Sequence, residues 1–325
     1  MKDLKLDNPL HLYLLGTVLR RERRFSEYLH LTESASDTSV RAQRAASLFE
    51  VGRPKDALVC FPAEEHWSCA STMAECHLFL LDRCEANRAI EKVGVKDGKG
   101  YMAWRASKAT FWDGDVSLAQ ELWPHPHPDS TLLMYQGRFP ECWEAWSREI
   151  EGSVMAPSAK SLTLLYFRAI LWMYEERWGE ALQHFEKVLS CSEQDPKRRD
   201  YSSLYSLTCR CWMGEARLEE LEELSKALSA RYSQAPLIQL DIMINRADVM
   251  SGIDRHEQVL ELVQATLLEE PRAFYRAFLM DLRSSALRSL GQIAEAEEED
   301  QAILQTCPGS YWAKRAVLRL QLPPE

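Results

Sequence analysis

The sequence lacks the short motifs and the long apolar runs on which many enzymes and membrane proteins depend. It has no G-x-x-x-x-G-K-[ST], G-x-G-x-x-G, G-x-S-x-G or H-E-x-x-H segment, so the chemistries that these motifs support have no signature here. The apolar run from Leu10 to Leu19 is too short to span a bilayer, and an arginine cluster follows it rather than precedes it. That polarity is wrong for a signal peptide. We therefore expect a cytoplasmic protein that is neither an enzyme nor bound to a membrane.

Paired cysteine knuckles of the zinc-binding type are also missing. The chain has nine cysteines, an odd number that favours reduced thiols over a disulfide framework. Residues two apart on a helix point in different directions, which does not suit a shared metal ion. We predict buried structural thiols and no bound metal or cofactor. The candidates weighed for a site are Cys69, Cys76, His77, Cys84, Cys209 and Cys211.

A second metal candidate lies where histidines alternate with prolines. His125 and His127 have Asp129 nearby but no cysteine or acidic pair at a ligand spacing. Alternating prolines favour an extended backbone. We interpret this stretch as a rigid connector.

Positive charge is scarce, and it is not gathered in one place. The formal net charge is −10, and 18 acidic residues face 9 basic residues between Glu215 and Asp300. An acidic surface repels phosphate backbones, so we expect no nucleic-acid binding by this chain alone. The basic runs at 20–24 and 197–199 are short, and we interpret the acidic run at 295–300 as the solvated face of an outer helix.

A recurring spacing of a turn residue, a small residue five positions later and an aromatic residue four positions after that dominates the chain. Glycine permits the positive φ that ends a first helix, and the small residue lets a second helix approach it closely. The aromatic residue lies on the same helical face as the small one and fills the space beyond. The five instances are Gly52/Ala57/Phe61, Gly114/Ala119/Trp123, Gly137/Cys142/Trp146, Glu176/Ala181/Phe185 and Gly291/Ala296/Asp300.

The same pattern predicts nine hairpin turns, 23 to 40 residues apart. The helix before each turn should carry its own apolar stripe, and before the first turn this stripe consists of Leu12, Leu15, Gly16 and Leu19. Prolines at 124, 126 and 128 should stop one helix near Trp123. Asp300 stands where an aromatic residue is expected, which suggests a last, partly exposed hairpin. The predicted turns lie near Arg23, Gly52, Asp82, Gly114, Gly137, Glu176, Gly214, Asp254 and Gly291.

These segments resemble the tetratricopeptide repeat (TPR) family, whose pattern runs W-x2-L-G-x2-Y, then A-x3-F, then P over about 34 residues. The resemblance covers most of residues 9 to 310 with degenerate repeats. The segments that carry it are "LHLYLLGTVLRRERRF", "GRPKDALVCF", "GDVSLAQELW", "GRFPECWEAW", "RWGEALQHF" and "GQIAEAEEEDQAILQTCP".

The expected fold is all-α: one right-handed α-solenoid of about nine TPR-like helical hairpins with a C-terminal capping helix. We expect N-terminal repeats over residues 1–123, C-terminal repeats over 124–310 after a proline-rich kink, and the capping helix and tail over 311–325. Each repeat of a solenoid is expected to bury its apolar surface only against its neighbours.

The resemblance implies a scaffold or adaptor that binds a peptide or helix of a partner protein in a concave groove lined by the first helices. An alternative is a sensory or regulatory domain of a larger signalling or transcription regulator, and an enzyme is a third. Aromatic and basic groove residues would suit a segment with some acidic residues. Counting from the turns predicts a groove lined by Trp104, Arg105, Lys108, Tyr166, Tyr205, Asn245 and Asp248, unless these aromatics fill a closed superhelix.

Overall fold

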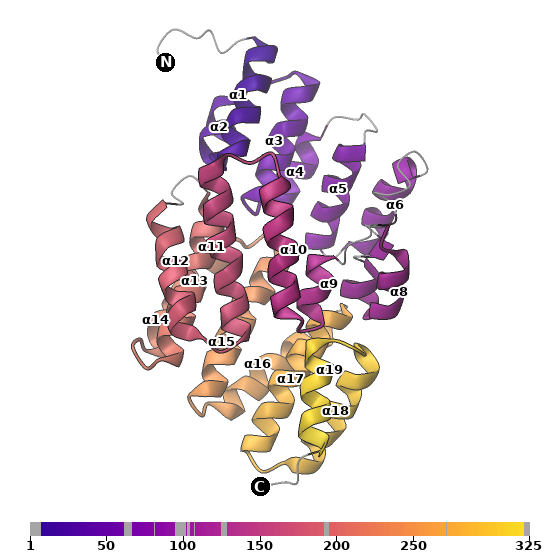
Figure 1. Ribbon diagram of the computed structural model, residues 1–325, viewed down its shortest axis with the longest axis vertical. Helices are drawn as coiled ribbons and strands as arrows, with labels where there is room; N and C mark the ends of the chain where they lie inside the picture. The colour runs from indigo at the N-terminus through magenta and orange to yellow at the C-terminus, as the bar shows by residue number, and fades with distance from the viewer. Residues whose placement is uncertain are drawn as a thin grey trace. The chain divides into compact units, whose positions relative to one another are not determined.

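The computed structural model describes residues 8–61, 67–80, 82–94, 102, 105–106, 108–124, 129–191, 195–270 and 272–321. Helices follow one another along the chain from α1 to α19, and none of the described residues belongs to a β-strand (Figure 1). Consecutive helices pair as hairpins. The predicted all-α solenoid of helical hairpins is therefore the fold of this chain.

The helices divide between two compact units, each made of two stretches of chain. Unit 1 comprises residues 1–97 and 149–242, and unit 2 comprises 98–148 and 243–325. The boundaries of these units differ from the boundary predicted at Trp123. That predicted boundary separates two groups of repeats, and it stays a prediction. Unit 1 holds α1 (Pro9–Arg21), α2 (Phe25–Leu31), α3 (Thr38–Glu50), α4 (Pro54–Cys60), α5 (Trp67–Phe79), α6 (Arg83–Gly94), α11 (Pro157–Tyr174), α12 (Trp178–Cys191), α13 (Pro196–Trp212) and α14 (Leu218–Arg231). Unit 2 holds η1, a π-helical turn (Ala109–Asp113), α8 (Val116–Leu122), α9 (Ser130–Tyr135), α16 (His256–Glu269), α17 (Ala273–Ser289), α18 (Ile293–Thr306) and α19 (Tyr311–Gln321), while α10 (Phe139–Gly152) and α15 (Pro236–Gly252) contribute to both units.

The predicted turns share one backbone conformation. The turn residue has a φ between 58° and 78° at eight of the nine predicted positions among the described residues, the exception being Asp82. At seven of these eight turns the N–H of the next residue donates to a carbonyl five residues back, as Arg24 does to Leu19 and Arg177 to Trp172, both at 2.8 Å; after Gly114 the Asp115 N–H donates to Ala109, six residues back. This bond satisfies a carbonyl that the helix end would otherwise leave unpaired. The spacing that predicted the turns is thus a helix-termination signal.

The small and aromatic residues occupy the predicted packing positions. Ala57, Ala119 and Ala181 are buried at the starts of second helices, at no more than 1% exposure. Four residues later, Phe185 is fully buried and Phe61 nearly so. A small side chain at the crossing and a ring beside it therefore fix how each second helix packs.

The sequence pattern also contains a helix-start signal that the glycine and alanine spacing did not include. Five second helices begin with an arginine whose guanidinium pairs with a carboxylate three residues later. Such pairs lie within the first turn, where negative charge is favourable. They are Arg24–Glu27, Arg53–Asp56, Arg138–Glu141, Arg177–Glu180 and Arg217–Glu220.

The expectation that each hairpin packs only against its neighbours in sequence is wrong within unit 1. The guanidinium Nε of Arg23, in the first turn, lies 2.6 Å from a carboxylate oxygen of Asp195. A Cβ atom added to Gly52, in the second turn, would lie 2.7 Å from the Tyr232 ring and 2.9 Å from Ile238. Early turns therefore pack on the starts of later helices, and Gly52 is required by this close approach as well as by its φ.

Unit 2 repeats this arrangement with different residues. A Cβ added to Gly137 would lie 2.6 Å from the Tyr311 ring. The Phe139 and Tyr311 rings are 5.4 Å apart between centroids, and Lys314 Nζ donates to the Gln136 carbonyl at 2.5 Å. The start of α19 is thus held by a turn more than 170 residues earlier in the chain.

The proline-rich stretch acts on the helices as predicted. The helix before it, α8, ends at Leu122, and α9 has only six residues, beginning after Asp129. The Asp129 carboxylate accepts a hydrogen bond from the Thr131 N–H at 3.0 Å, so it caps this helix. His125 and His127 lie outside the described residues.

The cysteine prediction holds in part. Cys76, Cys209 and Cys211 are buried, whereas Cys84 is exposed on the first turn of α6. Cys69 lies on α5, but its side chain is outside the described part of the structure. No group of three His, Cys, Asp or Glu side chains placed to hold a metal ion occurs in the described part of the chain.

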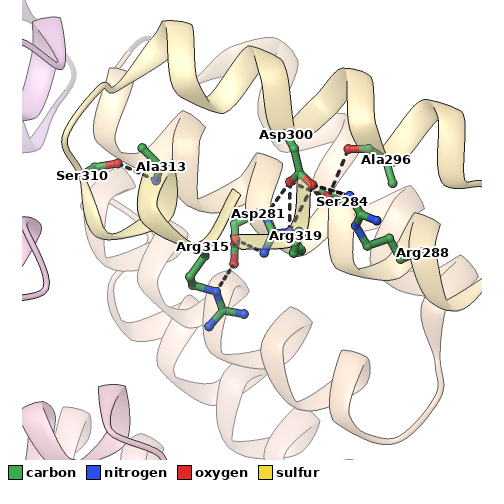
Figure 2. Close-up of polar contacts among 9 residues, drawn as sticks. All are labelled: Asp281, Ser284, Arg288, Ala296, Asp300, Ser310, Ala313, Arg315 and Arg319. Atoms are coloured by element: carbon green, nitrogen blue, oxygen red, sulfur yellow. Dashed lines mark hydrogen bonds and ion pairs between the residues drawn. The ribbon is translucent and has the colours of Figure 1, made fainter. Parts of the chain in front are cut away.

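The last hairpin departs from the prediction at Asp300, which is fully buried rather than partly exposed. Its carboxylate accepts hydrogen bonds from Ser284 Oγ at 2.8 Å, Arg288 Nη2 at 2.7 Å and Arg319 Nη2 at 2.6 Å (Figure 2). Arg319 also pairs with buried Asp281 at 2.7 Å. Burial alone would raise the pKa of Asp300, but the hydrogen bonds from Arg319 and Arg288 outweigh it and lower the pKa.

This ion network joins α17, α18 and α19 (Figure 2). Trp312, Ala313 and Ala316 of α19 are buried, and Leu287 and Ile303 of the hairpin beneath are buried as well. A charge replaces the aromatic residue because Arg288 and Arg319 surround its position.

No helix in the described part of the chain combines the length and the apolar composition that crossing a bilayer requires.

We predict that Asp300→Ala lowers the free energy of unfolding by about 3–5 kcal/mol, because Arg288 and Arg319, both largely shielded from water, lose the buried carboxylate that they share. Glu297→Ala, at an exposed position on the same helix, is the matched control and should change it by no more than about 0.5 kcal/mol. Thermal melting followed by circular dichroism compares the two. Equal melting curves would show that the network does not hold the last hairpin.

Candidate functional site

The structure brings two of the seven predicted groove residues into one cluster. Tyr166 on α11 and Tyr205 on α13 are half-buried in unit 1, with ring centroids 6.4 Å apart. Arg105 is exposed and Lys108 half-buried in unit 2, where half-buried Asn245 and Asp248 lie on α15. The charge of Asp248 helps to raise the pKa of Arg315. Trp104 lies outside the described residues.

The two tyrosines belong to a cluster of aromatic rings on α11, α12 and α13 of unit 1. Phe185 of α12 is fully buried, and its ring centroid lies 6.1 Å from that of Tyr166 and 5.3 Å from that of Tyr205. Tyr201, one turn before Tyr205 on α13, lies 5.6 Å from it. Beneath the rings is a core that contains Ala181 and Cys209. Each tyrosine is therefore packed on the core but only half-buried.

The hydroxyl groups of this cluster are held in their neutral form. Tyr201 donates to an Asp241 carboxylate oxygen at 2.7 Å. Burial raises the pKa of Tyr166 and, together with the Asp241 charge, that of Tyr201. Burial likewise raises the pKa of the Cys76 and Cys209 thiols to about 12. These groups are protonated at neutral pH, so they offer hydrogen bonds and apolar surface rather than nucleophiles.

Arg198 supplies a positive charge beside the rings. Its guanidinium carbon lies 5.4 Å from the centre of the Tyr166 ring, and Nη1 donates to Thr163 Oγ1 at 2.7 Å. Burial and the nearby charge of Arg23 lower its pKa to about 10, so it remains charged at neutral pH. A cation over a tyrosine face is attracted by the ring quadrupole. This contact orients Tyr166.

An ion cluster lies at the start of α13, next to Arg198. Asp195 accepts from Arg23 Nε at 2.6 Å, and Arg23 Nη2 lies 3.4 Å from a Glu50 carboxylate oxygen. Burial opposes ionisation of Glu50, but Lys197 and Arg23 outweigh it and lower its pKa. The cations of this cluster therefore already have carboxylate neighbours.

Glu75 on α5 is the exception in this cluster. Its side chain is open to water, yet surrounding protein and the negative charge of Glu50 raise its pKa to about 7, against the opposing effect of Lys197. Half of such carboxyls are protonated at neutral pH. A positive charge placed beside Glu75 would favour its ionised form.

Sequence reasoning missed Arg198, Tyr201, Asp241 and Glu75. The first two were detectable, because Arg198, Tyr201 and Tyr205 follow one another at spacings of three and four residues on α13, which places them on one helical face. Asp241 and Glu75 lie on other helices, and no spacing relates them to the tyrosines. Asp241 reaches Tyr201, and Glu75 reaches Glu50 and Lys197 of the ion cluster, only through the packing of unit 1.

Comparison with known proteins adds little to this geometry. No protein-family model matches the sequence, and no curated protein matches it. One solved structure, the crystal structure of the P58(IPK) TPR domain, aligns with 97% of this chain and 99% of that one, at 13% sequence identity and a TM-score of 0.25. The TPR-like hairpin architecture rests on the turns and the packing described above.

We predict that Glu75→Gln stabilises the protein at about pH 8 and has no effect at about pH 4. The folded-state pKa of about 7 exceeds the ordinary 4.5, so the ionised group disfavours folding once the pH rises above 4.5, and fully above 7. Water screens an exposed carboxylate, so the gain is about 1 kcal/mol or less. Thermal melts across this pH range measure it.

Glu33→Gln serves as the control, because Glu33 is also an exposed glutamate of unit 1. A gain for Glu75→Gln that is the same at both ends of the pH range would refute the repulsion between Glu75 and Glu50.

Proposed function

We propose that this chain is a protein-interaction scaffold and that unit 1 binds a segment of a partner protein on the tyrosine surface of α11 and α13. This surface consists of Tyr166, Arg198, Tyr201 and Tyr205. The observation that carries the proposal is the clustering of three half-buried tyrosines and one arginine on first helices. Tyrosine and arginine are enriched among the residues that supply most of the binding energy at protein interfaces.

The arrangement suits a binding surface because it is already ordered. The Tyr166 ring is held by Arg198 and Phe185, and the Tyr201 hydroxyl by Asp241. Side chains that are fixed before binding lose little conformational entropy when a partner arrives. The exposed parts of the half-buried tyrosines then offer apolar contact area.

The charges beside the surface indicate the chemistry of the partner. For the surface around Arg105 and Lys108, the prediction is still a partner that carries acidic residues. In unit 1, however, Arg23 and Arg198 contact Asp195, and Glu75 is exposed with a raised pKa. We therefore propose a segment with an apolar or aromatic side chain for the tyrosines and a basic side chain for Glu75.

The experiment is a selection of binders from a random 12-residue peptide library on the full chain. Selected peptides should combine aromatic and basic residues. Tyr205→Ala should weaken their binding at least tenfold, or about 1.4 kcal/mol, as fluorescence anisotropy measures. Its cost in stability should remain small, because the ring is only half-buried.

Phe185→Ala is the matched control, since Phe185 belongs to the same ring cluster but is fully buried. It should cost about 3–5 kcal/mol of folding free energy. If Tyr205→Ala melts as early as Phe185→Ala, or binds the selected peptides as tightly as the parent, the tyrosine surface is core packing and not a binding site.

A further inference from the structure

The first helix exposes an apolar stripe that ends at a position, held by Val18, that later first helices bury. On α1, Leu10, Tyr13, Leu14 and Val18 are 61%, 40%, 53% and 49% exposed. Tyr13, Leu14 and Val18 follow Leu10 by three, four and eight residues, which places them on one side of the helix. The other side, which includes Leu12, Gly16 and Leu19, is buried. The stripe is therefore additional to the surface that α1 packs within its own hairpin.

A comparison of hairpins by register shows how unusual this stripe is. At the hairpin turns other than the one at Gly114, the carbonyl of one residue accepts a hydrogen bond from the backbone N–H five residues later. We call the residue just before that carbonyl's residue the pre-turn position. In the first hairpin the residue at the pre-turn position is Val18. In the other hairpins in which the structure describes this bond, the residue at the pre-turn position is no more than 5% exposed. These residues are Ser47, Cys76, Leu132, Leu171, Cys209, Val249 and Ala286.

Three of these hairpins show what covers the pre-turn position. Cys76 packs in a cluster with Ala57 and Phe61, from the second helix of the preceding hairpin and its cap. Cys209 packs in the same way with Ala181 and Phe185. Leu132 packs in a cluster with Ala119, against which Trp123 also packs. In each case the cover is a helix with a small residue and, four residues later, an aromatic one.

The charge on α1 distinguishes between occupants. The helix contains no acidic residue, and its last turn carries Arg20 and Arg21. Arg21 is exposed. A second copy of α1 would bring the same positive charges to the contact, and like charges repel. At the other end of the array, the face of α18 that holds Ala296 and Asp300 is already buried.

We propose that the α1 stripe is a docking site for an amphipathic helix of another protein. That helix presents a small residue and an aromatic residue four positions later on its apolar face, with acidic residues beside them. It takes the place that a preceding second helix holds in the later hairpins. This site is separate from the tyrosine surface and does not depend on it.

The probe is a synthetic peptide of residues 178–191, the second helix α12, which carries Ala181, Phe185 and two glutamates. Cys191→Ser prevents oxidation, and Gln183→Glu allows a lactam bridge to Lys187. Both bridge positions are exposed, so the bridge stabilises the helix without covering its apolar face. Fluorescence anisotropy then follows binding to the full chain.

We expect saturable binding that the variant Leu14→Gln/Val18→Gln weakens at least tenfold. Because both side chains are exposed, this variant should melt with the parent; if it does not fold, Leu14→Gln alone serves. The control is Leu268→Gln, at a position that is 78% exposed on α16, and it should bind like the parent. A peptide with Phe185→Ala should bind at least tenfold more weakly.

Two results would overturn the proposal. One is the absence of saturable binding, or binding that the α1 variant leaves unchanged. The other is self-association of the parent chain in sedimentation velocity that Leu14→Gln/Val18→Gln abolishes, because the occupant would then be a second copy of α1.

Discussion

The closure of each hairpin turn is the constraint on which the rest of the structure depends. A residue with positive φ ends the first helix, and the next N–H donates to a carbonyl five residues back, or six at Gly114. The register of both helices is then fixed relative to that turn. The small residue, the aromatic residue and the pre-turn position fall into contact for this reason, and three clusters of the described core repeat the arrangement.

The turns and the helices around them could be predicted from the sequence, because they depend on residues close together in the chain. Glycine at Gly52 or Gly114, followed by alanine five residues later, is a local signal. Even Arg23, Glu176 and Asp254, which have side chains that disfavour positive φ, were placed by spacing alone. The arginine that starts a second helix was equally local and was overlooked.

The remaining features depend on contacts that no spacing reveals. Asp300 was expected to lie on a solvated helix face with the rest of the acidic run at 295–300, yet it is buried, and Arg288 and Arg319 satisfy its charge. The contact of Gly52 with Tyr232 joins residues 180 positions apart. The candidate site follows the same rule: Tyr201 and Tyr205 share a helical face, whereas Asp241 meets Tyr201 only through packing.

The two proposed surfaces arise from opposite situations on first helices. Tyr166 and Tyr205 are half-buried within unit 1 and ordered by their neighbours. The α1 stripe instead belongs to a position that later hairpins bury. A scaffold with both would hold one partner segment on ordered tyrosines and another on the open side of its first helix.

Native-state hydrogen exchange followed by mass spectrometry tests most directly whether early turns pack on later helices as one unit. The contacts of Arg23 with Asp195 and of Gly52 with Tyr232 predict that α1 to α4 and α11 to α14 lose protection together at one denaturant concentration. Hairpins that open one after another from α1 onward, with α11 to α14 unaffected, would contradict this account and indicate an array held only by contacts between neighbours.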